Sequence, residues 1–156
     1  MALVCMLPSA CRSGGGHGDE QLVNVDRSGL ALQGYDPVAY FPEGSNVPQR
    51  GRVELAIKHE GATYRFANPE NLARFAADPE RYVPAYGGWC AWAMVNGERV
   101  SINPRSFLIE DGRLLLFYDS LFADTRARWR EANSPALGAE ADSHWTVIVR
   151  EAASRP

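Results

Sequence analysis

Two strand–turn–strand patterns constrain the fold of this chain more than any other part of its sequence. The segment SFLIEDGRLLLFY sets Asp111-Gly112 between two apolar runs, and Asp-Gly is a favoured pair in two-residue hairpin turns. In VELAIKHEGATYRF, apolar and polar residues alternate up to Glu60-Gly61, and an apolar pattern resumes after it. Both segments are predicted to form antiparallel β-hairpins, and the run LLLFY indicates a strand that is buried on both faces.

Short helices are predicted around the hairpins from their start signals. Asn68-Pro69 and Asp78-Pro79 each combine a capping side chain with a proline, which suits the first position of a helix. The segment GGWCAWAMV is also expected to form a helix. Its two glycines are expected to allow a close backbone approach where that helix begins.

The last part of the chain is predicted to hold two helices and a short strand. The segment DSLFADTRARWREAN has the pattern of an amphipathic helix that begins near Asp119 and turns Leu121 and Phe122 inward. A polar helix is expected from Pro135 to about Trp145, and the segment TVIV is expected to add a terminal strand.

These elements indicate an α+β fold in which small antiparallel hairpins pack with several short helices. The hairpins and helices are grouped, whereas parallel crossover units would alternate strand and helix. The chain has 156 residues, of which 46% are hydrophobic, and this is enough for the core of a single domain. That domain is expected to span residues 22–150, with a polar tail over 151–156.

The charge pattern argues against nucleic acid as a partner. The net charge is −3, from 16 basic and 19 acidic residues, and no Lys/Arg cluster marks a surface that follows a phosphate backbone. No apolar run approaches the roughly 20 residues that span a bilayer. Membrane association is therefore expected only through a lipid anchor.

Residues 1–21 have two interpretations. The start, MALVCMLPSAC, is similar to the apolar end of a secretion signal, and the segment RSGGGHGDEQ that follows is typical of a flexible tether. Cys11 would then be the lipidated first residue of a mature bacterial lipoprotein. However, no Lys or Arg precedes the apolar segment, so an N-terminus with two incidental cysteines is the other interpretation.

Four ordered blocks resemble a known family. GYDPVAYF, GATYRFANPENLARFAADPERYVPAYGGWCAWA, EDGRLLLFY and ADSHW are similar to the YHS-domain proteins, in particular to their longer secreted or lipoprotein-type branch. The resemblance extends over residues 30–145. It implies a protein of the bacterial periplasm or cell envelope that binds or handles a metal ion, copper or another soft transition metal.

The cysteines that the shorter family members use for metal binding are missing from this chain. Ala39 and Ala67 occupy those two positions, so a thiolate site cannot be transferred to them. Cys90 remains, because it lies in the YGGxCA block of the longer branch. The alternative function is a non-catalytic ligand-binding or protein-binding module that has lost the metal ligands.

Three roles remain open for Cys90. It can be a small buried hydrophobic residue, which is where free cysteines usually lie. It can bind a soft metal together with Met94 on the same helical face and with His59 or His144. It can also be a reactive thiol, although no CxxC motif or nearby basic residue activates it. His59 beside a turn and His144 at the end of a polar helix are equally ordinary surface positions.

A group of aromatic residues around an Asp-Pro turn is the other candidate site. Tyr35, Asp36, Tyr64, Tyr86 and Trp89 are expected either to form a structural polar network or to line a small ligand pocket. The sequence contains no phosphate-binding glycine loop, no Ser-His-Asp order and no carboxylates paired at helical spacing. An enzyme is therefore not expected.

Overall fold

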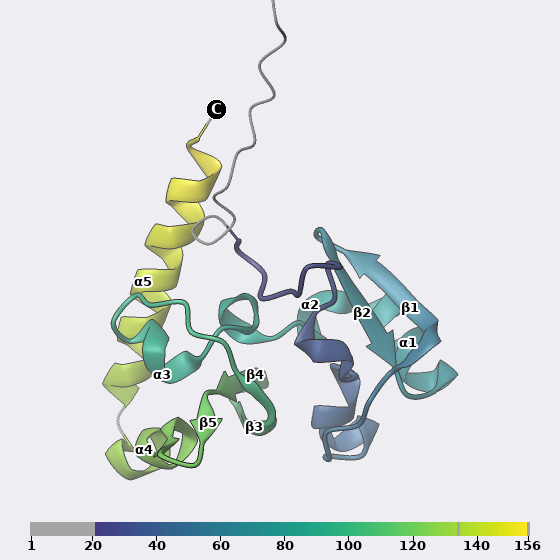
Figure 1. Cartoon of the computed structure of the whole chain (residues 1–156), viewed down its shortest axis with the longest axis horizontal. Helices are drawn as coiled ribbons and strands as arrows, with labels where there is room; N and C mark the ends of the chain where they lie inside the picture. The colour runs from purple at the N-terminus through teal and green to yellow at the C-terminus, as the bar shows by residue number, and fades with distance from the viewer. Residues whose placement is uncertain (1–20, 134, 156) are drawn as a thin grey trace, which may run out of the picture.

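The structure is a computed structural model that describes residues 21–133 and 135–155. The described residues have the predicted α+β fold, with three two-stranded antiparallel sheets (Figure 1). The sheets are β1–β2 (Arg52–His59, Ala62–Phe66), β3–β4 (Asn103–Glu110, Arg113–Phe117) and β5–β6 (Asp119–Ser120, Ala123–Asp124). Cys11 and nearly all of the predicted signal-like segment lie outside the described residues.

Short helices connect the hairpins. Before β1 come three 3-10 helices, η1 (Leu32–Gly34), η2 (Val38–Tyr40) and η3 (Pro42–Gly44). Between the first two hairpins lie α1 (Pro69–Ala77), α2 (Pro79–Tyr82), the 3-10 helix η4 (Ala85–Gly88) and α3 (Ala91–Met94). The chain ends with α4 (Thr125–Ala132) and α5 (Pro135–Ala153). In Figure 1, the β1–β2 hairpin and α1 form one side of the molecule, and α3, α4 and α5 form the other.

The proline start signals are confirmed for both helices after β2. The Asn68 side chain accepts a hydrogen bond from the backbone N–H of Asn71 at 2.8 Å, and Pro69 is the first residue of α1. Pro79 likewise begins α2, although the Asp78 side chain makes no capping hydrogen bond there. Local capping chemistry therefore fixes where this part of the chain turns helical.

Strand β4 joins two hydrophobic clusters, as its continuous apolar sequence predicts. Leu114 and Leu116 pack with the β1–β2 side of the molecule, around Tyr40, Phe66 and Phe75. The next residues along the strand, Leu115 and Phe117, face the cluster beneath α5. The last four side chains of β4 are all buried, because successive residues of a strand point to opposite faces and a cluster covers each face.

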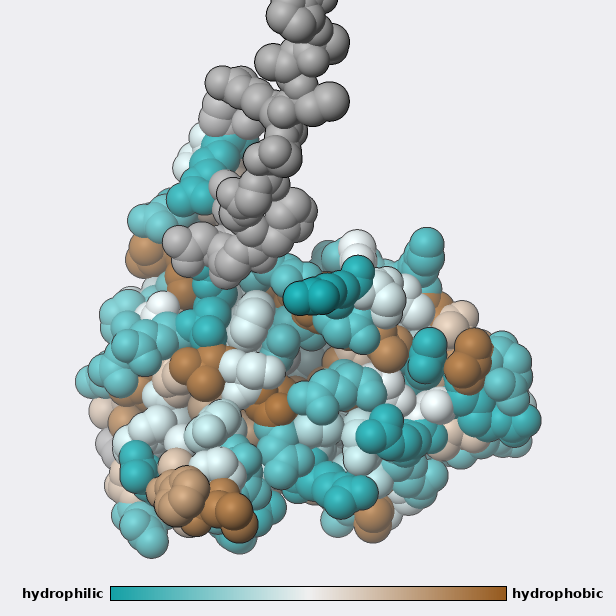
Figure 2. Space-filling model, in the orientation of Figure 1, coloured by the Kyte–Doolittle hydropathy of each residue, from teal (hydrophilic) through white to brown (hydrophobic). Residues whose placement is uncertain are grey.

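The predicted inward orientation of Leu121 and Phe122 is wrong. These side chains are 96% and 94% exposed at the tip of the β5–β6 hairpin, and Figure 2 shows hydrophobic side chains at this end of the molecule. The Thr125 hydroxyl donates to the Tyr118 carbonyl at 2.6 Å and closes the hairpin. The helix α4 therefore begins only after Asp124, whose side chain accepts from the backbone N–H of Ala127 at 2.8 Å.

The predicted strand in TVIV is also wrong, because α5 continues without a break to Ala153. The predicted tail over 151–156 therefore begins inside this helix. Trp145 and Ile148 lie three residues apart and both pack on the cluster that contains Tyr86 and Phe117. This spacing belongs to a helix face. No helix among the described residues combines the length and the apolar character needed to cross a membrane.

Candidate functional site

Cys90 is part of the packed core. Its thiol is fully buried, accepts a hydrogen bond from the backbone N–H of Tyr118 at 3.2 Å and lies 3.5 Å from the Thr125 hydroxyl. The helix α3 begins only at Ala91, so the helical face predicted for Cys90 and Met94 does not form. Cys90 instead packs in the cluster on the β1–β2 side, and Met94 packs in the cluster beneath α5. Of the three roles that remained open for Cys90, these contacts agree with packing as a small buried residue.

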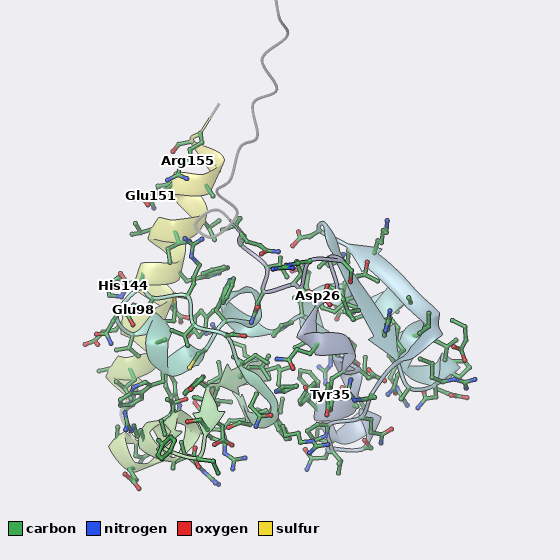
Figure 3. The ribbon with its side chains drawn as sticks, in the orientation of Figure 1. Asp26, Tyr35, Glu98, His144, Glu151 and Arg155 are labelled. Carbon is green, nitrogen blue, oxygen red and sulfur yellow. The ribbon has the colours of Figure 1, made fainter. Side chains whose placement is uncertain are left out.

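The predicted metal-binding histidines lie apart from Cys90. His144 is exposed in the middle of α5, whereas it was predicted at the end of a helix. Its ring faces Gly97, where an added Cβ would lie 3.3 Å from the ring. Figure 3 shows His144 beside Glu98, on the side of the molecule that α5 forms. His59 is the last residue of β1. Cys90, His59 and His144 therefore form no common cluster among the described residues.

The predicted aromatic set is divided between a buried network and a surface cleft. Asp36 is fully buried and saturated with hydrogen bonds, Tyr35 packs under Arg50 at 4.9 Å, and the Trp89 indole donates to the Leu22 carbonyl at 3.2 Å. Tyr64 and Tyr86 line a common cleft of about 650 Å³. This cleft lies between the β1–β2 turn, α2, η4, the β3–β4 turn and α5.

The charges of this cleft favour a cation. Two arginines line it, but Arg81 is bound to Glu43 at 2.7 Å and Arg113 to Asp142 at 2.8 Å, and neither of these carboxylates is part of the lining. Two glutamates, Glu60 and Glu80, line the same cleft, and neither has an arginine or lysine partner among the described residues. Because no arginine or lysine of the described residues neutralises them, the carboxylates of Glu60 and Glu80 make the cleft locally acidic.

Glu60 and Glu80, which line the cleft, form a group of three potential metal ligands with His59. His59, Glu60 and Glu80 each offer one ligand atom, and these atoms all lie within 4.8 Å of one another. Within the part of the chain that the structure describes, no other set of three His, Cys, Asp or Glu side chains is as close. His59 was predicted as a metal residue, and the structure supplies it with two carboxylates in place of a thiol.

The His59 imidazole is held in place and lacks a hydrogen bond. Its ring packs edge-on against Phe75 at 5.8 Å between centroids. The buried Nε2 atom lies 3.3 Å from a Glu80 oxygen, within ion-pair distance, but it makes no hydrogen bond to the described residues. A buried polar atom without a hydrogen bond costs about 1–3 kcal/mol, so a water molecule or metal ion that binds Nε2 would stabilise the site.

Glu60 occupies a backbone conformation that glutamate rarely adopts. Its φ is +46° and that of Gly61 is +79°, as in a two-residue type I′ turn, which prefers Asn, Asp or Gly at the first position. The second hairpin has the same geometry at Asp111 and Gly112, with the favoured residue pair. The β1–β2 turn therefore carries a carboxylate at some conformational cost, which is typical of a functional position.

Replacing Glu60 with asparagine is expected to raise the free energy of unfolding by about 0.5 kcal/mol, because asparagine tolerates positive φ better than glutamate does. Urea unfolding measures the change. The control is Asp111→Asn, which replaces one favoured turn residue by another. It should change the free energy of unfolding by less than about 0.5 kcal/mol. A clear loss of stability in Glu60→Asn would show instead that the Glu60 carboxylate stabilises the turn.

Sequence reasoning missed Glu80 as a site residue. It follows Pro79 in the first turn of α2, where an acidic residue is ordinary because it interacts favourably with the helix dipole. Nothing in the sequence indicates that α2 returns to the β1–β2 turn. No protein-family model, curated protein or solved structure shows significant similarity to the chain, so the resemblance to YHS-domain proteins stays a prediction.

Proposed function

We propose that this protein binds a transition-metal ion through His59, Glu60 and Glu80. The grouping of their three ligand atoms within 4.8 Å, at an acidic cleft, is the observation that carries the proposal. One imidazole nitrogen and two carboxylate oxygens suit metal ions that accept nitrogen and oxygen donors. The proposal keeps the metal binding implied by the sequence resemblance, and with it the bacterial envelope as the location, but moves the site away from Cys90.

Small side-chain movements can close the ligand group around an ion. Protein nitrogen and oxygen ligands lie about 2.0–2.2 Å from zinc, so neighbouring ligand atoms around one ion are roughly 3–3.5 Å apart. The Glu80 side chain is 73% exposed and is free to rotate, whereas the His59 side chain is 22% exposed and is fixed by Phe75. A rigid imidazole with two adjustable carboxylates therefore allows the closure.

Cys90 is a poor alternative ligand. A soft monovalent ion prefers several thiolate or thioether donors, but Met94 packs in a different cluster and the Cys90 thiol is already engaged by Tyr118 and Thr125. Bringing an ion to this thiol would require opening the core between β4 and α4. For this reason Cys90→Ala is a control for the proposed site.

The test is a titration of tag-free protein with Co²⁺ and Zn²⁺, followed by calorimetry and by the visible spectrum of bound cobalt. His59→Ala is expected to weaken binding about 100-fold or more, since even residues that only orient metal ligands contribute about 10–100-fold. Glu80→Gln, which removes a charge without changing size, should weaken binding at least about tenfold.

His144→Ala and Cys90→Ala are the matched controls, and both should bind as the wild type does. His144 is an exposed histidine outside the ligand group. Equal affinity of the wild type and His59→Ala would refute the proposed site. A loss of binding confined to Cys90→Ala would return the metal site to the thiol.

A non-catalytic ligand-binding module is the second candidate function. The Tyr86 and Trp145 rings, which meet edge-on at 6.4 Å, line the cleft together with Glu60 and Glu80, and this combination of aromatic rings and carboxylates fits a small organic ammonium ion. Titration with tetramethylammonium in the presence of a metal chelator tests this function. Binding that survives chelation and is lost in Trp145→Ala would support it, and absence of binding would refute it.

A further inference from the structure

Tyr64 is a buried residue in the wall of the acidic cleft, and its hydroxyl makes no hydrogen bond to the described part of the protein. The residue is only 3% exposed, yet it lines the cleft together with Glu60 and Glu80. Among the described residues its hydroxyl has no hydrogen-bond partner. The buried hydroxyls of Tyr40 and Tyr86, in contrast, donate to the Pro104 carbonyl at 2.8 Å and to Asp142 at 3.0 Å. Because a tyrosine that is buried to this extent normally has a partner for its hydroxyl, the unpaired Tyr64 hydroxyl in the cleft wall is available to a ligand.

The β1–β2 hairpin places Tyr64 and His59 on the same face. His59 is opposite Ala62 in the antiparallel register and Ile57 is opposite Tyr64, so His59 and Tyr64 are diagonal neighbours. Side chains in this relation are within reach of each other when they are aromatic or long. Both rings also pack on Phe75, His59 at 5.8 Å and Tyr64 at 5.1 Å between centroids. One aromatic residue of α1 thus positions both.

The surroundings of Tyr64 disfavour a phenolate as long as no cation is near. Burial raises the pKa of the Tyr64 hydroxyl to about 12, and the negative charges of Glu60 and Glu80 act in the same direction. A bound metal ion reverses the local electrostatics, because it favours deprotonated ligands.

We infer that Tyr64 is a fourth ligand of the proposed site and binds as a phenolate, so that the site is suited to a hard trivalent ion such as ferric iron. The inference rests on the proposed function. Two carboxylates and one phenolate supply three negative charges and His59 is neutral, so the ligands balance a charge of +3. On binding, the Tyr64 O–H bond breaks, the proton passes to solvent and an oxygen–iron bond forms, with no change in oxidation state.

The experiment adds ferric citrate to the tag-free protein and records the visible and resonance Raman spectra. A ferric phenolate produces a visible charge-transfer band and tyrosinate vibrations, both expected in the wild type and in Tyr118→Phe. Both signals should vanish in Tyr64→Phe, which keeps the ring that packs on Phe75. Cobalt binding through the other three ligands should fall by less than about tenfold in this variant.

The outcomes separate this inference from the function on which it rests. Cobalt binding that depends on His59, combined with no charge-transfer band in the wild type, would refute the role of Tyr64 and leave the proposed function standing. A band that persists in Tyr64→Phe would also refute it, whereas a protein that binds neither cobalt nor ferric iron would refute both. Because the Raman measurement on the wild type needs no variant, a folding defect in Tyr64→Phe would not prevent the test.

Discussion

Replacing Asp36 with alanine is expected to lower the free energy of unfolding by about 3–5 kcal/mol. The Asp36 carboxylate is fully buried and accepts hydrogen bonds from the backbone N–H groups of Val38 at 2.8 Å, Ala39 at 3.3 Å and Ala67 at 2.8 Å. It also accepts one from the Asn71 side chain at 2.8 Å. Alanine would leave the donors of Val38, Ala67 and Asn71 without this acceptor, whereas the Ala39 N–H keeps its bond to the Asp36 backbone carbonyl. Each buried donor without a partner costs about 1–3 kcal/mol.

Urea unfolding followed by circular dichroism measures the loss. The control is Asp26→Ala, because Asp26 also accepts hydrogen bonds from nearby groups, those of Ser28 and Leu30, but in an exposed loop. Water can replace the carboxylate there, so a loss of about 1 kcal/mol or less is expected. Similar losses in the two variants would contradict the view that Asp36 is a central structural residue.

The contacts of Asp36 show which part of the fold could be predicted. The bonds to Val38 and Ala39 lie within the Asp-Pro turn that the sequence indicated through its residue types. The bonds to Ala67 and Asn71 cross 31 and 35 positions of the chain. Their existence depends on how η2 packs against the end of β2 and α1, and no local propensity encodes that packing.

The same division applies to the secondary structure. Turn pairs and proline start signals act within a few residues, and they predicted the hairpins and the start of α1 correctly. The apolar pair Leu121 and Phe122 was misassigned because hydrophobic spacing alone cannot distinguish a helix face from a hairpin tip. Here the hydrogen bond from the Thr125 hydroxyl to the Tyr118 carbonyl favours the hairpin over the helix.

The candidate site could be predicted only in part from the sequence, for a similar reason. His59 and Glu60 are adjacent in the sequence, and His59 was predicted as a metal residue. Glu80 reaches them only because α2 packs back against the hairpin turn, and Tyr64 is notable only because its hydroxyl lacks a partner. Cys90, the most conspicuous residue of the sequence, is instead occupied by Tyr118 and Thr125.

Replacing Gly87 with alanine is expected to lower the free energy of unfolding by about 2–4 kcal/mol. The φ of Gly87 is +60°, where an L-residue with a side chain costs about 1–2 kcal/mol. A Cβ at this position would also overlap the Leu22 carbonyl oxygen and lie 3.2 Å from the Trp145 ring, and such overpacking typically costs about 1–3 kcal/mol more.

The control Gly112→Ala separates the two causes in a urea unfolding experiment. Gly112 has a φ of +73°, but a Cβ there would have no neighbour within 4 Å, so only the conformational cost of about 1–2 kcal/mol is expected. The excess in Gly87→Ala therefore measures the contacts with Leu22 and Trp145. The segment of Leu22 is held at this place, because the Asn24 backbone N–H donates to the Gly87 carbonyl at 2.8 Å. Equal losses in the two variants would show that the segment around Leu22 moves aside at little cost. This segment also lines the acidic cleft, so in that case the cleft wall it forms would be adjustable.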